Sequence, residues 1–170
     1  MAQYNQRMNR AVYCQASTLS HTEITADQGA FFGSVLGTLN HIMVGDLIWL
    51  KRFATLPSLV WLDTPLGQFP TPTSLNQMLH VTLPALEQQR IAVDTLIMEL
   101  ADVVTPGICE QTLRYRNTQG QAKAKNLGML LQHFFNHQTH HRGQVSTLLY
   151  QMGVDVGTTD LLADIAELRQ

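Results

Sequence analysis

The sequence predicts an all-α protein, a four-helix bundle with a small β-hairpin before the last long helix and a short helix at the C-terminus. Three observations support this fold class. Apolar residues recur at helical spacing in four long stretches, only one short stretch alternates like a hairpin, and a proline-rich segment separates the second and third helices. A chain of 170 residues with 45% apolar and 14% charged residues also suits one compact domain, so we expect a single domain over residues 1–170.

The first two helices follow from their apolar patterns. The first is expected from about residue 2 to 20, with Tyr4, Met8 and Val12 at helical spacing. A connector at residues 27–29 separates it from a second helix over about 30–54. That second stretch is apolar on most sides, which is typical of a central helix.

The third helix is preceded by the proline-rich linker over about residues 55–73, which is too long for a tight turn between helices. Ser74 to Gln77 resembles a capping box, so the helix is expected to begin near Ser74. Pro84 either kinks this helix or marks the true start of its longer half, because proline lacks a backbone N–H. The helix should end before Pro106.

The last third of the chain predicts a hairpin and two more helices. Residues 109–124 show strand-like patterning around a turn at residues 117–120. A fourth long helix should span about 126–152 and stop at Gly153, the expected residue after a helix end. A short helix over about 159–168 offers apolar side chains for docking: Leu161, Leu162, Ile165 and Leu168.

Four histidines crowd into the fourth helix, and their positions around it differ. His137 and His141 stand one turn apart; His141 falls within the apolar stripe and His137 at its edge. His133 and His140 fall outside the stripe and are interpreted as solvated, and Arg142 also points away, as a structural or interfacial residue. The inward pair is either a hydrogen-bonded core pair or part of a metal site, and spacing alone leaves both open.

A third metal ligand would have to come from another helix, and His41 is the one histidine in the second. The small residues around it either leave room for a metal or allow close helix packing, and both remain open. His41 lies about ten residues into its helix and His141 about eleven before the end of the fourth, so they meet only if these helices are antiparallel. The long proline-rich linker can cross the bundle and produce that arrangement, an up-down-down-up topology.

Other polar residues on these helices could support the site. Asp46 projects onto the apolar stripe of the second helix, where a carboxylate needs a partner. It could orient a ligand imidazole, pair with a basic group, or make a purely structural hydrogen bond. Asn40 and Gln144 are further candidates for a supporting role. Gln138 occupies the place that glutamate, the general base, holds in HExxH peptidases, which argues against a peptidase.

Composition excludes several classes of protein. The net charge is −2 without a Lys/Arg cluster, which argues against nucleic acid as a partner. No apolar stretch approaches the roughly 20 residues of a membrane span. Cys14 and Cys109 are far apart and form no C-x-x-C pair, so we expect a reduced, cytoplasmic protein.

The chain resembles the DinB family, metal-dependent bundle proteins named for DNA-damage-inducible members. The resemblance covers essentially the whole chain and rests on motifs in every part of it. These are Tyr4-Asn5 with Asn9, Phe31-Phe32-Gly33-Ser34 with Thr38-Leu39-Asn40-His41, Asp46 and Trp49, Asn136-His137 with His140-His141-Arg142-Gly143-Gln144, and the tail from Gly153 to Leu162.

The resemblance implies an up-down-down-up bundle, a metal site formed by His41, His137 and His141, and frequent homodimers. Three imidazoles with open coordination positions suit zinc or nickel first, and iron or copper as well. Relatives in the wider superfamily include transferases and isomerases that use low-molecular-weight thiols. One hypothesis is therefore a metal-dependent, thiol-dependent S-transferase or related detoxifying enzyme acting on a small thiol or electrophile. The alternative is a non-catalytic, stress-associated protein with a structural or regulatory metal.

Overall fold

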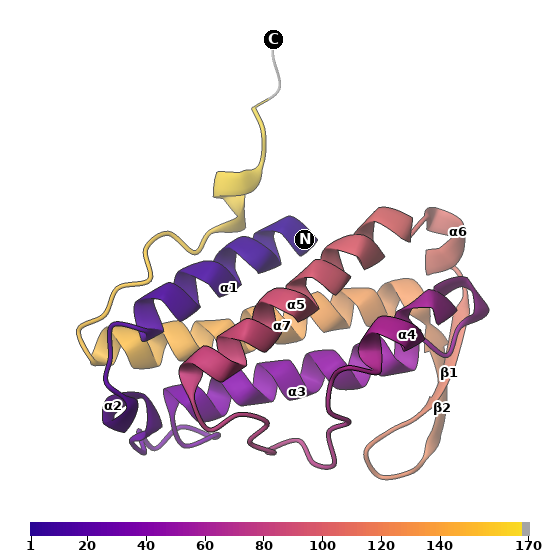
Figure 1. Ribbon diagram of the computed structural model, residues 1–170. Coiled ribbons are helices and arrows are strands. Elements are labelled where there is room, and N and C mark those ends of the chain that lie inside the picture. Colours follow the sequence, from indigo (N-terminus) through magenta and orange to yellow (C-terminus); the bar gives the residue numbers. More distant parts are fainter. Residues whose placement is uncertain (168–170) are drawn as a thin grey trace.

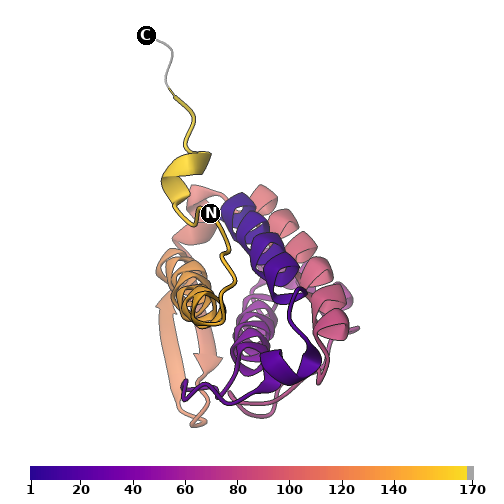
Figure 2. The ribbon, with the colours of Figure 1, turned by 90° about the vertical axis from the view of Figure 1, so that its left-hand side faces the viewer.

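The computed structural model describes residues 1–167, and most of them are helical. The long helices lie side by side in Figure 1 and are grouped around one apolar core in the view of Figure 2. Helix α1 packs against α5 and α7, and α3 packs against the same two helices. Their bounds are α1 (Ala2–Ala16), α3 (Val35–Phe53), α5 (Leu83–Val103) and α7 (Leu127–Gln151). No helix within residues 1–167 has both the length and the apolar character needed to cross a membrane.

The direction of the chain differs between the long helices. In Figure 1, it runs from right to left in α1 and α7 and from left to right in α3 and α5. Contacts between α3 and α7 agree with this. His41 of α3 lies beside His141 of α7, and Gly45, one turn later in α3, lies beside His137, one turn earlier in α7. These two helices are therefore antiparallel. This is the relation that the positions of His41 and His141 along their helices require if the two side chains are to meet.

The first helix is shorter than expected, because it ends at Ala16 rather than near residue 20. A separate short helix, α2 (His21–Thr25), follows. Its start is a capping box: the Ser20 hydroxyl accepts from the Glu23 N–H at 3.3 Å, and the Glu23 carboxylate accepts from the Ser20 N–H at 2.7 Å. This local pairing favours a new helix start over continuation of α1.

The start of α3 lies at Val35, five residues after the predicted position. The Ser34 hydroxyl accepts from the Gly37 N–H at 3.0 Å and satisfies one of the free donors of the first turn. The residues before it form a loop in which Gly29 and Gly33 have positive φ angles of 67° and 73°. This loop conformation, which helical periodicity does not reveal, excludes residues 30–33 from the helix.

The predicted start of the third helix near Ser74 is wrong, and the alternative at Pro84 is right. Helix α5 begins at Leu83 and contains Pro84 in its first turn, where a missing N–H costs nothing. The apparent capping box is instead a turn, in which the Gln77 side chain accepts from the Thr73 N–H at 2.7 Å. The linker before it is partly helical, with a 3-10 helix η1 (Pro57–Leu62) and the short helix α4 (Asp63–Leu66).

The hairpin and the last long helix agree with expectation. After the short helix α6 (Pro106–Cys109), strands β1 (Thr112–Arg116) and β2 (Ala122–Asn126) pair antiparallel. Asn126 then caps α7, since its side-chain oxygen accepts from the Met129 N–H at 3.0 Å. Helix α7 stops before Gly153, which has a φ of +79°.

The short helix expected at the C-terminus is confirmed as a late helix, η2 (Leu161–Asp164), which within the described residues is a single 3-10 turn. Its predicted docking is wrong, because the side chains face solvent, with Leu162 75% and Ile165 62% exposed. Leu168 lies outside the described residues. The tail is attached to α1 by polar contacts instead, among them a 2.7 Å hydrogen bond from the Tyr4 hydroxyl to the Thr159 carbonyl.

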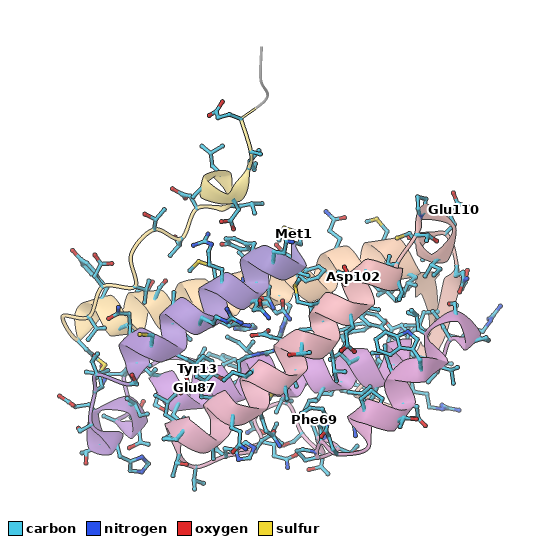
Figure 3. The ribbon with its side chains drawn as sticks, turned by 45° about the horizontal axis from the view of Figure 1, so that its top comes forward. Met1, Tyr13, Phe69, Glu87, Asp102 and Glu110 are labelled. Atoms are coloured by element: carbon cyan, nitrogen blue, oxygen red, sulfur yellow. The ribbon has the colours of Figure 1, made fainter. Side chains whose placement is uncertain are left out.

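Side chains fill the space between the helices (Figure 3), and the interior is not uniformly apolar. Asp46 of α3 is fully buried and forms an ion pair of 2.5 Å with Arg90 of α5. Its second carboxylate oxygen accepts from the Gln138 amide of α7 at 2.6 Å. Burial raises the pKa of Asp46, while the Arg90 guanidinium and the hydrogen bond from Gln138 oppose that rise.

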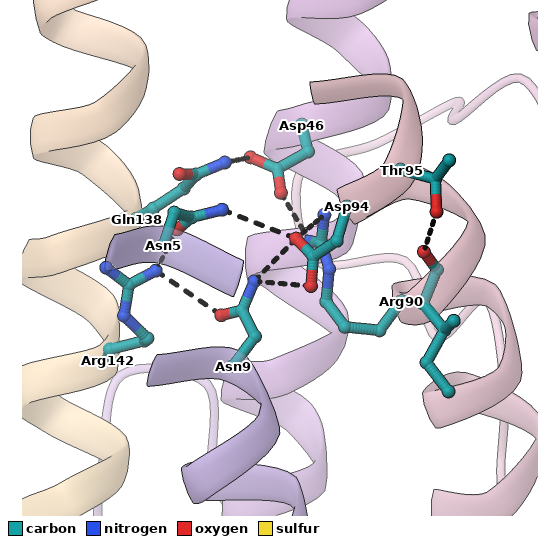
Figure 4. Close-up of polar contacts among 9 residues, drawn as sticks. Asn5, Asn9, Asp46, Arg90, Asp94, Thr95, Gln138 and Arg142 are labelled. Carbon is teal, nitrogen blue, oxygen red and sulfur yellow. Dashed lines mark hydrogen bonds and ion pairs between the residues drawn. The ribbon is translucent and has the colours of Figure 1, made fainter. Parts of the chain in front are cut away.

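The remaining members of this buried polar network come from α1, α5 and α7 (Figure 4). Asp94 lies 3.0 Å from Arg90 and accepts from the Asn9 amide at 2.9 Å. Arg142 donates to the side chain of Asn5. Although Arg142 falls outside the apolar stripe of α7, it is therefore buried, because it faces this polar part of the interior. All four long helices are linked by the network.

The network predicts that replacing an aspartate by asparagine destabilises the protein much more in the buried network than at the surface. Asp46→Asn should lower the free energy of unfolding by about 3–5 kcal/mol, because it leaves Arg90 buried without full charge compensation. Asp164→Asn should cost less than about 1 kcal/mol, since the Asp164–Arg7 pair is partly exposed. Urea denaturation of both variants measures the difference. Equal losses would show that the network does not hold the helices together.

Candidate metal centre

Three histidine side chains from two antiparallel helices meet in the interior. His41 comes from α3, and His137 and His141 come from successive turns of α7. The Nε2 atom of His41 lies 3.2 Å from the Nε2 atoms of both His137 and His141. The candidate ligand atoms of the three side chains all lie within 4.8 Å of one another. The cluster could therefore hold a metal ion.

The outer ring nitrogens of two of these histidines face hydrogen-bond acceptors. His41 Nδ1 lies 2.7 Å from the Leu75 carbonyl oxygen, and His141 Nδ1 lies 2.7 Å from the Gln144 side-chain oxygen. A neutral imidazole that donates through Nδ1 carries its lone pair on Nε2. Both lone pairs then point inward toward each other, an arrangement that a shared cation relieves.

The spacing of the nitrogens also fits a metal ion. Two Zn–N bonds of about 2.0–2.1 Å at a near-tetrahedral angle place their nitrogens about 3.3 Å apart. The 3.2 Å separations from His41 agree with that value. The donor set and its geometry therefore suit a divalent ion that accepts imidazole.

Protonation of the cluster is suppressed, which keeps its nitrogens available as ligands. Burial, together with the charges of the neighbouring histidines, lowers the pKa of His137 from 6.5 to about 3. Burial also lowers the pKa of His41 and of His141. Metal ions bind the neutral imidazole, so the ligand form dominates at neutral pH.

Two glycines of α3 allow close contacts at and beside the cluster. A Cβ atom on Gly45 would lie 2.6 Å from Cε1 of His137, and one on Gly37 would lie 2.1 Å from the Phe32 carbonyl oxygen. The small residues around His41 therefore allow close packing. At Gly45, the atoms that pack closely are those of a candidate ligand itself.

Phe32 defines the outer side of the cluster. Its ring stacks on His41 with centroids 3.8 Å apart and an angle of 16° between the planes, and it meets the edge of His141 at 5.6 Å. The backbone of Phe32 lies close to Gly37 of α3. His41 is consequently clamped between Phe32 and the two histidines of α7.

Of the three residues predicted to support the site, one touches a histidine of the cluster and two do not. Gln144 touches His141 directly, as described above. Asp46 touches no imidazole and instead contacts Arg90 and Gln138, so within the described chain it pairs with a basic group. Asn40 accepts from the His80 N–H at 3.0 Å and thereby holds the linker before α5.

A cavity of about 660 Å³ opens onto the cluster, a size that suits a small-molecule ligand. His41, Gly45 and His137 form part of its wall, and the mainly apolar remainder includes Phe31, whose side chain is 88% exposed. His133 is exposed and also lines this cavity, whereas His140 is exposed outside its wall. Both lie outside the three-histidine cluster.

Sequence reasoning missed the residues that position the cluster through loops. The Leu75 carbonyl and the Phe32 ring act through the linker and the loop before α3, and no periodic pattern points to them. The sequence marks Gln138 only by the absence of a glutamate base, whereas in the structure it is fully buried and connects α7 to Asp46. The burial of Gln138 could have been inferred from its position, since it follows His137 on the side that faces α3.

A mainly helical protein with three converging imidazoles beside an open cavity is a candidate metal-binding protein. Comparison with known families is more specific. A model of the DinB family matches residues 1–169, and the chain belongs to that family. It is similar to "Protein DinB" of Bacillus subtilis (strain 168), with 22% identity over 160 residues that cover 93% of this chain and 87% of the relative. No solved structure matches.

Substitution of Gly45 tests the packing against His137. Gly45→Ala should weaken metal binding by at least about tenfold, because the new methyl group would push the His137 ring out of line. Gly143→Ala is the matched control, since a Cβ there meets no atom within 4 Å and the change is also glycine to alanine in a helix. Competitive titration of zinc against a chelating indicator measures both affinities. Equal affinities would contradict the assigned role of Gly45.

Acid should destabilise the metal-free protein partly through His137. Its pKa lies near 3 in the folded state and near 6.5 in the unfolded chain, so between these values the unfolded chain binds more protons. The stability contributed by His137 is therefore complete above about pH 6.5 and declines as the pH falls toward 3. Urea denaturation in chelator between pH 7 and 4 should show this decline.

The contribution of His137 is isolated by a variant. Burial raises the pKa of Asp46 and of Asp94, so these two groups make the folded state more stable as the pH falls, opposite to the effect of His137. His137→Gln removes only the histidine contribution, so its stability should fall less steeply than that of the wild type. Parallel curves would mean that His137 titrates normally in the folded protein.

Proposed function

We propose that this protein is a metal-dependent enzyme of the thiol S-transferase type. His41, His137 and His141 would hold a divalent ion, with zinc or nickel preferred and iron or copper also compatible with imidazole. The observation that carries this proposal is the convergence of three imidazoles, in which the Nε2 atom of His41 lies 3.2 Å from those of His137 and His141. Two of them, His41 and His137, line a cavity large enough for a substrate. A ligand set of three histidines leaves coordination positions free, which is typical of catalytic sites.

The surroundings of the cluster favour thiol chemistry over hydrolysis. Within the described chain, no Asp or Glu lines the cavity, so a carboxylate general base is missing from its wall. Gln138 follows His137 where a peptidase has glutamate, and its amide donates to Asp46. Hydrolysis by an HExxH-type mechanism lacks its proton acceptor here. A thiol needs less help from a base, because a coordinating divalent ion deprotonates it.

The chain's own residues would orient the reaction. Leu75 and Gln144 keep the Nδ1 protons of His41 and His141 in place, and Phe32 excludes water from one side of His41. In the transfer, the thiol proton goes to solvent and the sulfur forms a bond to an electrophilic carbon. The bond from that carbon to its leaving group breaks, and the electron pair departs with the leaving group.

Further properties belong to the same proposal. The four long helices would form an up-down-down-up bundle within a single domain over residues 1–170, and two copies would form a homodimer. A cytoplasmic location is supported by the free thiols of Cys14 and Cys109. The substrates would be a low-molecular-weight thiol and a small electrophile, with neither nucleic acid nor a membrane as a partner.

Metal-dependent turnover tests the proposal. Untagged protein, analysed for its metal content, is incubated with a panel of thiols and a chlorodinitrobenzene, with and without chelator. We expect thioether formation that chelator abolishes and zinc or nickel restores. His141→Ala should lower the rate by at least about a hundredfold, because it removes one of the three candidate ligands.

His21→Ala is the control, since His21 is an exposed histidine of α2 outside the cluster. It should retain both metal and activity. If chelation lowers the melting temperature but no thiol and electrophile pair reacts, the protein is instead a non-catalytic, stress-associated metal-binding protein. If His141→Ala retains the full metal content and melting temperature, the three-histidine site is excluded from both functions.

A further inference from the structure

We infer that the thiol substrate carries an anionic group at the end remote from its sulfur, and that Arg52 recognises this group. The inference rests on the proposed thiol function and adds a substrate class to it. Arg52 lies in the wall of the same cavity as His41 and His137. Its position, its fixed orientation and the charge of the surrounding wall support the inference independently.

Arg52 lies on the same face of α3 as the histidine cluster. His41, Gly45, Ile48 and Arg52 follow one another at intervals of three or four residues, and all four line the cavity. Eleven residues of helix separate His41 from Arg52, which corresponds to about 16 Å along the axis. Long side chains on a helix lean toward its N-terminus, so the guanidinium of Arg52 leans toward the cluster.

The guanidinium of Arg52 is held by two aromatic rings rather than by an acid. It lies 4.7 Å from the ring centre of Trp49 and 4.8 Å from that of Tyr115. One N–H donates to the Arg116 carbonyl oxygen at 3.0 Å, which leaves further donors of the planar fork for a ligand. In residues 1–167, no carboxylate lies within ion-pair distance of Arg52.

A second cavity, of about 580 Å³, adjoins the first. The two cavities share Ile48, Arg52, Leu75 and Thr118 as lining residues, so Arg52 borders both. Lys51 lines the second cavity and carries another positive charge. Its ammonium group donates to the Thr71 hydroxyl at 2.6 Å.

The charge of this wall is opposite to that of the whole protein. The chain has a net charge of −2, yet among its described residues neither cavity is lined by Asp or Glu. Burial lowers the pKa of Arg52, because desolvation disfavours the charged guanidinium. A planar guanidinium between aromatic rings is well suited to bind a carboxylate or phosphate through two parallel hydrogen bonds.

These positions define the substrate class. The thiol sulfur would lie at the histidine cluster, and an anionic group would lie no more than about 16 Å away at Arg52. Between them, the apolar side chains of Ile48 and Trp49 line the path. An elongated thiol with an apolar middle and a terminal anion fits this path, whereas a short neutral thiol leaves Arg52 without an anionic partner.

Thiol binding to cobalt-loaded protein tests this inference. Mercaptocarboxylates of graded chain length are titrated against their terminal amides, and the sulfur-to-cobalt charge-transfer absorption reports binding. We expect the best carboxylate to bind about ten to a hundred times more tightly than its amide, as a charge-assisted hydrogen bond provides. Arg52→Gln should remove most of this preference and leave amide binding within about threefold of wild type.

Arg52 also supports the hairpin through Arg116, so its structural role has to be separated from recognition. A purely structural role would weaken carboxylate and amide binding equally, and that result would overturn the inference. Arg7→Gln is the control, because Arg7 pairs with Asp164 at the surface, and it should retain the preference. Equal binding of carboxylate and amide to the wild type overturns this inference alone, whereas no absorption with any thiol overturns the proposed thiol function.

Discussion

The arrangement of this protein depends on one buried ion pair, between Asp46 of α3 and Arg90 of α5. Both side chains are removed from water, and the contact between them offsets the cost of burying each charge, with Asp94 as a second partner of Arg90. Gln138 extends the contact to α7. Because a slip along either helix would break these contacts, the pair and its partners fix the helices in one register, which an apolar interface alone would specify less strictly.

The histidine cluster uses this register directly. Gly45 precedes Asp46 on α3, and His137 precedes Gln138 on α7, so the contact between Asp46 and Gln138 also brings Gly45 against the His137 ring. The residues that fix the register and the residues of the histidine cluster are therefore neighbours on the same two helices. The side chains of the polar network are buried, whereas His41 and His137 line a cavity of about 660 Å³. Such an arrangement keeps a rigid support behind a site that small molecules can reach.

Much of the local structure and part of the site could be predicted from residues, and the misses have physical causes. Helical periodicity located all four long helices, and the positions of His41 and His141 along two of them predicted the antiparallel relation that the structure shows. The predicted end of the first helix is wrong because a side-chain cap at Ser20 starts a new helix. The predicted docking of the C-terminal helix is wrong because apolar side chains such as Leu162 face solvent. Arg142 has a structural role, as predicted, but its burial does not follow from the sequence, because an apolar stripe does not reveal a second, polar part of the interior.

The sequence by itself determined the class of fold and which histidines could act together, because helical spacing is a local property of the chain. Only the tertiary structure decided what surrounds them. The Leu75 carbonyl contacts His41 although the two residues lie in segments far apart in sequence. Arg52 lines the same cavity as His41 and His137 because several elements enclose that space together. Such contacts depend on loop conformation and helix register, and these are set by the packed molecule as a whole rather than by any one segment.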